Sequence, residues 1–216
     1  MSQTSTPTRR TVGPLLRRAA EMERAAWHSL YVWLRRRPRV SDPGDAPFAY
    51  VGVIKPILGT FIALSVVEIP IFDVVVTHVV PWHPARWIVL GLGVWGLLWM
   101  LGFLATLTVH PHIVGDRGIR VRHGANVDFT VPWDEVASVS KRYRSVPTNK
   151  SVQFEVHDGR RVLNVAVGKQ TSIDVRLRRP LTFDLPTGPS EPVDEIRIYA
   201  DDADGFPRAR LAAATA

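Results

Sequence analysis

An uncharged apolar run of twenty-three residues, Trp87–Val109, constrains this chain more than any other feature. A helix of that length rises about 34 Å, and a bilayer has a hydrocarbon core of about 30 Å. Because hydrocarbon offers the backbone no hydrogen-bond partner, such a run satisfies its own amides best as one continuous helix. The sequence therefore predicts a transmembrane helix at about 87–109.

A second apolar stretch, Tyr50–Val80, precedes this run and is interrupted by Lys55, Glu68 and Asp73. We expect its spanning part at about 54–76, with Lys55 extending to the interface at one end. The connection 77–86 is short and contains two prolines, so the spans should form a hairpin over residues 50–110.

Glu68 falls within the hydrocarbon in this placement, where a charged carboxylate costs at least about 2.5 kcal/mol. One interpretation is a proton or ion relay that uses Glu68 and Asp73 in an oligomer. The other is a carboxyl that is hydrogen-bonded across the hairpin or lies near the outer interface. His78 and His83 with Asp73 form a weak metal-ligand pattern, and polar groups at the interface explain them better. We therefore expect no metal and no cofactor.

Basic residues predict the orientation of the hairpin. Nine arginines precede the first span, Arg117, Arg120 and Arg122 follow the second, and the connecting loop holds only Arg86. By the positive-inside rule, both termini should be cytoplasmic in a two-pass protein of the plasma (inner) membrane. The excess of 23 Arg over 4 Lys suggests a GC-rich bacterial genome.

Residues 1–49 form a basic arm with a formal charge of +5. From about Pro14 to Arg37, apolar residues recur at helical spacing, and Trp27, Tyr31 and Trp33 suit the headgroup level. We expect an amphipathic helix that binds anionic headgroups rather than nucleic acid, since the charge adjoins the membrane. A helix packed on the soluble part, or a disordered arm, is the alternative. Residues 39–47 are interpreted as a linker.

Gly91, Gly93 and Gly96 spell G-x-G-x-x-G, but no strand precedes them, so a dinucleotide site is not expected. Small residues on one face of a transmembrane helix allow a second helix to approach closely. This face is predicted to pack within the hairpin or to form a homo-oligomer.

Residues 111–216 change to a period of two, which is typical of strands. Alternating residues predict strands near 113–114, 119–123, 127–131, 136–144, 152–156, 163–167, 173–177 and 196–198, with a hairpin turn at Asp158-Gly159. Residues 180–192 look irregular, and a short helix is expected at about 203–214. The expected fold class is a membrane α + β protein: a transmembrane hairpin, then a small antiparallel barrel or sandwich closed by a C-terminal helix.

The segment Gly118–Gly124 (GIRVRHG) and the following Val131–Val139 (VPWDEVASV) resemble the opening of bacterial pleckstrin-homology-like (PH-like) domains. Such domains often follow two transmembrane helices in small actinobacterial proteins. The later Leu177–Pro180 and Ile196–Asp202 also fit. The resemblance implies a membrane-tethered binding or assembly module and carries over no catalytic residues. In this region we expect Trp133 to pack on the core, with Asp134 and Glu135 exposed.

Several basic side chains of the β domain are candidates for binding anionic lipid or an unidentified protein partner, with an ordinary solvated face as the alternative: Lys141, Arg142, Arg144, Arg160, Arg161, Arg176, Arg178 and Arg179. The chain lacks cysteine and the common hydrolase and nucleotide motifs. The sequence therefore favours a non-enzymatic membrane-anchored binding module. A transport component using Glu68 and Asp73 is the alternative.

Overall fold

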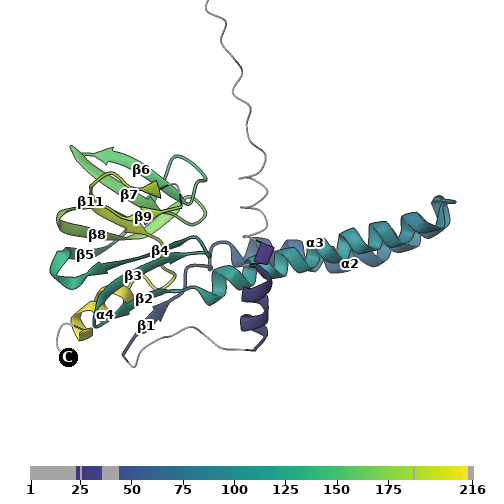
Figure 1. Cartoon of the computed structure of the whole chain (residues 1–216), viewed down its shortest axis with the longest axis horizontal. Coiled ribbons are helices and arrows are strands. Elements are labelled where there is room, and N and C mark those ends of the chain that lie inside the picture. Colours follow the sequence, from purple (N-terminus) through teal and green to yellow (C-terminus); the bar gives the residue numbers. More distant parts are fainter. Residues whose placement is uncertain (1–22, 25, 36–43, 187, 214–216) are drawn as a thin grey trace, which may run out of the picture.

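The computed structural model describes residues 23–24, 26–35, 44–186 and 188–213. Figure 1 shows a long helical hairpin with a β domain at one end. Close to the β domain, a short helical segment at 23–24 and 26–34 runs across the hairpin rather than along it. The described part of the predicted amphipathic helix is thus helical, and the remainder of 14–37 lies outside the described residues.

The hairpin consists of α2 (Lys55–Val79) and α3 (His83–Val109). Both helices are long and apolar enough to cross a membrane. α2 begins one residue after the predicted span 54–76 and continues three residues beyond its end. α3 begins four residues before the predicted span 87–109, because Pro84 stands in its first turn, where a missing amide hydrogen costs little. Among the described residues no side chain of α2 is buried. Monomeric soluble proteins rarely expose apolar surface of that extent, which marks membrane or protein interaction sites.

The β domain follows the predicted strands closely. Its strands are β2 (His112–Gly115), β3 (Gly118–His123), β4 (Val127–Pro132), β5 (Val136–Ser145), β6 (Val152–His157), β7 (Arg160–Val165), β8 (Gln170–Leu181), β9 (Asp184–Leu185), β10 (Gly188–Pro189) and β11 (Val193–Ile198), and the terminal helix is α4 (Gly205–Ala213). These strands, with β1 (Ala46–Phe48), form three sheets, whose strand orders are β1-β2-β3-β4, β5-β8-β11-β7-β6 and β9-β10. Apolar side chains of the two larger sheets and Phe206 of α4 form one core.

Two details of the predicted fold are corrected. Of the two predicted alternatives, the barrel is not formed by the described sheets: a 3-10 turn, Trp133–Glu135, separates β4 from β5, and these strands belong to different sheets. The strands are not all antiparallel either, since β11 pairs with β7 in parallel. This parallel pairing places the last strand between β8 and β7, a long-range arrangement that side-chain alternation cannot indicate.

The turn at Trp133–Glu135 also corrects a predicted exposure. Trp133 packs on the core, as expected, and its Nε1 donates a hydrogen bond to the Gly115 carbonyl at 2.9 Å. Asp134 is exposed, but Glu135 is buried. The Glu135 carboxylate accepts hydrogen bonds from Arg179 of β8, at 2.8 Å from Nε to Oε2, and this contact holds it against the sheet.

The hairpin is joined to the β domain at both ends. Before α2, β1 (Ala46–Phe48) pairs with β2, which directly follows α3, although the sequence placed residues 46 and 47 in a linker. Tyr50 is fully buried, and its Oη accepts a hydrogen bond from the Gly124 amide at 2.8 Å. The Asp201 carboxylate accepts the Gly52 amide at 2.9 Å. The chain therefore enters and leaves the hairpin through the same part of the β domain.

His112 forms the base of this joint. It is fully buried and stacks on Tyr50 with ring centroids 4.9 Å apart. Its Nδ1 accepts the Arg122 amide hydrogen at 3.1 Å, so Nε2 carries the ring proton and donates to the Tyr199 carbonyl at 3.0 Å. Burial lowers the pKa of His112 to about 3, and the nearby His123 and Arg122 add to this shift.

The neutral His112 should make the fold sensitive to acid. His112 is neutral in the folded protein down to a pH of about 3, whereas in the unfolded chain it binds a proton below about pH 6.5. Between these values, acid therefore favours the unfolded state, and the free energy of unfolding should fall by up to about 1.4 kcal/mol per pH unit as the pH is lowered. A His112→Gln variant, whose amide can keep both hydrogen bonds, should show a shallower slope. Tryptophan fluorescence during denaturant unfolding of the full chain in detergent measures this. His157→Gln, at a half-exposed position, should keep the wild-type slope; equal slopes in all three proteins would refute the assignment.

The β2–β3 turn depends on glycine at position 118. Gly118 has φ +139°, and a Cβ built there would lie 2.1 Å from the Val131 carbonyl oxygen. Gly159 has φ +72°, but its Cβ would meet nothing within 4 Å. Gly159→Ala should cost about 1–2 kcal/mol from backbone strain alone. Gly118→Ala should cost at least about 1 kcal/mol more because a backbone atom must move. Thermal unfolding of the full chain in detergent compares the two, and equal losses would contradict this account.

Candidate functional site

A polar pocket of about 350 Å³ opens on the outer face of the five-stranded sheet. It gathers five of the eight predicted basic residues, which come from β5, β7 and β8: Lys141, Arg142, Arg144, Arg160 and Arg176. Together with Arg197, six cationic side chains face three acidic ones, which leaves a formal charge of +3 with His157 neutral. We call this the basic pocket. Its charge suits an anionic ligand.

The floor of the basic pocket is a network of charges on β8 and β11. The Arg197 side chain is only 4% exposed and donates from Nε to Glu195 at 2.6 Å. Asp174 accepts hydrogen bonds from Arg144 through Oδ2 at 3.2 Å, and its Oδ1 lies 3.8 Å from Nε of Arg197. Burial raises the pKa of Asp174, and the Arg144 hydrogen bond opposes that rise. These contacts hold Arg144 and Arg197 in place.

At the mouth, the cations differ in how firmly they are held. Lys141 donates to Asp204 of the segment before α4 at 2.7 Å, and this ion pair raises the pKa of the lysine. Arg142 and Arg160 have no ion-pair partner among the described residues, so their guanidinium groups are available to a ligand. Guanidinium groups bind carboxylates and phosphates through paired hydrogen bonds.

The three remaining predicted residues lie outside the basic pocket. Arg161 pairs with Glu191, Arg179 pairs with Glu135, and Arg178 donates to the Val136 carbonyl at 3.3 Å. Each of the three is thus bound to its own surroundings. In the sequence analysis, Arg160 and Arg161 form one cluster because they are adjacent. Successive residues of a strand face opposite sides of the sheet, so only Arg160 lines the basic pocket.

Arg197 is the residue that the sequence analysis missed. It stands between Ile196 and Ile198, a pattern that indicates a solvated position, yet it is almost completely buried. One feature of the sequence could have indicated a buried ion pair: Glu195 stands two residues before Arg197, so the two side chains lie on the same face of the strand. That signal becomes informative only when the register pairs Arg197 with Asp174 on β8.

The basic pocket lies to the side of the domain, away from the hairpin. The C-terminal end of α3 packs beside the loops at 149–151 and 166–169, where β6 begins and β7 ends. His157 and Arg160 lie at the opposite end of the β6–β7 pair, five residues from Val152, which is about 17 Å along a strand. This part of the basic pocket therefore lies at the end of the β6–β7 pair that is away from α3.

The intramembrane acids are not brought together. The Asp73 carboxylate forms a two-point ion pair with Arg86 of α3, at 2.7 Å to Nε and 2.8 Å to Nη2. Glu68 is exposed on α2 and has no hydrogen-bond partner among the described residues. Five residues apart on a helix, the two side chains point about 140° away from each other.

The histidines of the connection do not join Asp73. His78 bonds through Nδ1 to the Val74 carbonyl at 2.8 Å. Among the described residues, no group of three or more histidine, aspartate or glutamate side chains is placed to hold a metal ion.

The glycines of α3 have different neighbours. A Cβ at Gly93 would lie 3.0 Å from Ile69 of α2, so this glycine permits packing within the hairpin. Gly102, nearer the β domain, lies against Ala26 of the crossing helix, and the Trp27 and Trp95 rings meet at 5.8 Å. Around Gly91 and Gly96 nothing lies within 4 Å of a built Cβ in the described structure. The predicted homo-oligomer through this face stays a prediction.

The Asp73–Arg86 pair should stabilise the hairpin at the end near the connection between α2 and α3. Asp73→Asn removes the charge and leaves Arg86 without its partner, so the full chain in detergent should unfold at a lower temperature. Exchanging the two residues, Asp73→Arg with Arg86→Asp, should recover part of the loss. Glu68→Gln on the same helix is the matched control and should leave the unfolding temperature unchanged. A loss with Glu68→Gln as large as with Asp73→Asn would contradict this account.

The comparisons with known proteins give no independent assignment. The resemblance to PH-like domains therefore rests on the short segments described above, and the architecture shown is two apolar helices followed by mixed β-sheets and a short helix. No family model, no curated protein and no solved structure matches this chain.

Proposed function

We propose that this chain is a non-enzymatic, membrane-anchored binding module whose basic pocket recognises an acidic segment of a protein partner. The observation that carries the proposal is the convergence of Lys141, Arg142, Arg144, Arg160 and Arg176 on one pocket. In this proposal α2 and α3 anchor the chain in the plasma membrane of a bacterium, with both termini in the cytoplasm, as the positive-inside rule favours.

The position of the basic pocket favours a protein over a membrane lipid as the ligand. Anionic headgroups would meet the domain where α3 packs against it, whereas the β6–β7 turn lies at the far ends of its strands. Surface potentials of membranes decay within about a Debye length, about 8 Å at physiological salt. A turn about 17 Å beyond the contact with α3 lies outside that range.

An exposed aromatic side chain beside the basic pocket also fits a protein partner. Tyr143 is 63% exposed on β5, and the Lys141 ammonium lies 5.6 Å from its ring centroid. Phe154 and Val156 on β6 are also exposed, but they lie on the opposite face of the sheet. These two strands are the edges of the five-stranded sheet. Aromatic side chains and arginines are enriched in protein interfaces, and a strand edge offers free backbone groups to an extended peptide.

Charge reversal tests the proposal. The double variant Arg142→Glu with Arg160→Glu should bind the partner about tenfold more weakly, since each reversal replaces an attraction of about 0.2–1 kcal/mol by a repulsion. Neither residue has an ion-pair partner among the described residues, so the fold should be retained. Affinity capture from solubilised membranes with the full chain, followed by titration of the captured partner, measures the change.

Arg178→Glu is the matched control, because Arg178 lies outside the basic pocket. The control should capture the same partner as the wild type, and added salt should weaken binding in both proteins. Partner binding that is unchanged by the double reversal would refute the proposal. So would a double variant that loses only its binding to anionic vesicles.

A further inference from the structure

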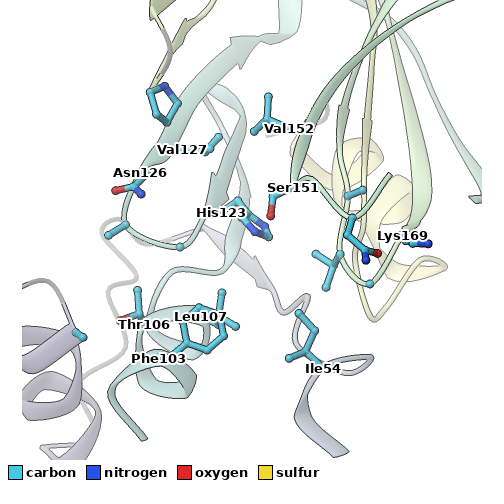
Figure 2. A pocket seen from close by; sticks show the side chains of 18 of the residues that line it. Ile54, Phe103, Thr106, Leu107, His123, Asn126, Val127, Ser151, Val152 and Lys169 are labelled. Atoms are coloured by element: carbon cyan, nitrogen blue, oxygen red, sulfur yellow. The ribbon is translucent and has the colours of Figure 1, made fainter. Parts of the chain in front are cut away.

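A second pocket, of about 540 Å³, lies where the β domain meets the hairpin (Figure 2). One wall is the inner end of α3, and the other is formed by the turn after β3 and by the loops at 149–151 and 166–169. Figure 2 shows Phe103, Thr106 and Leu107 of α3 on one side and the His123 ring projecting toward the space between the walls. We call this the junction pocket. Its volume falls within the range of about 300–1,000 Å³ that small-molecule sites occupy.

The depth of the junction pocket matches the headgroup level of a bilayer. With 27 residues, α3 is about 40 Å long, roughly 10 Å more than a hydrocarbon core. The buried residues of α3 all lie between Gly102 and Val109, so we place the excess length at this end and shift the span from the expected 87–109. The segment from Phe103 to Val109 covers about 9 Å and then lies at or beyond the inner boundary of the hydrocarbon. Trp99 and Phe103 stack with ring centroids 6.0 Å apart and are 49% and 39% exposed. Aromatic side chains favour this boundary.

The lining of the junction pocket is chemically one-sided. It is mostly apolar and includes no aspartate or glutamate, and its one cationic side chain is Lys169. Lys169 stands in a left-handed conformation at φ 64°, following Gly168 at φ 56°. It has no ion-pair partner among the described residues. A positive φ is unfavourable for residues other than glycine, and at Lys169 this backbone conformation fixes how the side chain leaves the loop beside the apolar wall.

His123 adds an unused polar group to this lining. Its ring stacks on Tyr50 at 5.3 Å, and its buried Nδ1 has no hydrogen-bond partner among the described residues. Burial lowers the pKa of His123, which keeps the ring neutral. Because Nδ1 is itself enclosed, a ligand would meet the part of the His123 ring that lines the junction pocket.

We propose that the junction pocket holds one anionic phospholipid of the inner leaflet, with its phosphate at Lys169 and its glycerol region near His123. The acyl chains follow Phe103 and Trp99 into the bilayer. This ligand matches each observation: an amphiphile suits an apolar wall with a polar mouth, and an anion suits a lining with a cation and no acid. The inference depends on the membrane placement of the hairpin but not on the basic pocket.

Native mass spectrometry of the full chain in mild detergent, with phosphatidylglycerol or phosphatidylcholine added, tests this proposal. One phosphatidylglycerol should be retained per chain, and phosphatidylcholine should not. Lys169→Gln should reduce the retained phosphatidylglycerol about fivefold, the effect of one lysine near an anionic surface. Lys150→Gln is the matched control: Lys150 is exposed on the neighbouring loop and does not line the junction pocket, so retention should not change.

A second variant keeps the test decisive if the charge contributes little. Ala125→Trp enlarges an exposed side chain at the mouth and should block retention while the thermal unfolding of the protein stays as in the wild type. Equal retention in the wild type, Lys169→Gln and Ala125→Trp would identify nonspecific annular lipid and overturn the proposal. Retention seen only after deletion of residues 1–22 would also overturn it, because that segment would then be the occupant. Intact lipid retention with no partner capture would leave this inference standing and refute the proposed function alone.

Discussion

The pairing of β1 with β2 is the constraint on which the arrangement of the whole molecule depends. These strands flank the helical hairpin in the chain, and Phe48 lies opposite His112 in the register. Both helices are therefore fixed to one sheet, so the domain cannot rotate about a flexible linker. Tyr50 strengthens the joint because its ring is buried against His112 while its hydroxyl caps the Gly124 amide. The hairpin and the β domain are joined through these contacts.

Much of this architecture could be predicted because it follows from local patterns. An uncharged apolar run predicts α3, and alternation predicts nearly every strand from β2 to β8 within a few residues. The three residues of β1 could not be predicted, since a strand so short leaves no periodic pattern and here contains a proline. The parallel pairing of β11 with β7 was equally inaccessible, because the partner of a strand is decided by core packing far away in sequence.

The basic pocket could be predicted in its residue types but not in its membership. Counting arginines identified the region, whereas the register decides which of them share a face. Arg160 and Arg161 are neighbours in sequence, yet only Arg160 reaches the pocket. Arg197 was missed because a buried arginine is recognisable only from the acids around it, Glu195 and Asp174, which come from two strands. The junction pocket had no signal in the sequence, since its walls come from α3 and from loops of the β domain that only the folded chain brings together.

That joint also accounts for the contrasting chemistry of the two pockets. At an anionic headgroup level, where we propose that the junction pocket lies, an ionised carboxylate would be repelled; the junction pocket has none among its described lining residues. The basic pocket faces water, where acids such as Asp174 can orient arginines without that penalty. Because the domain cannot turn over relative to the hairpin, neither surface can take the place of the other. The separation of an apolar, acid-free pocket from a charged, ordered one is thus a consequence of how the chain enters and leaves the hairpin.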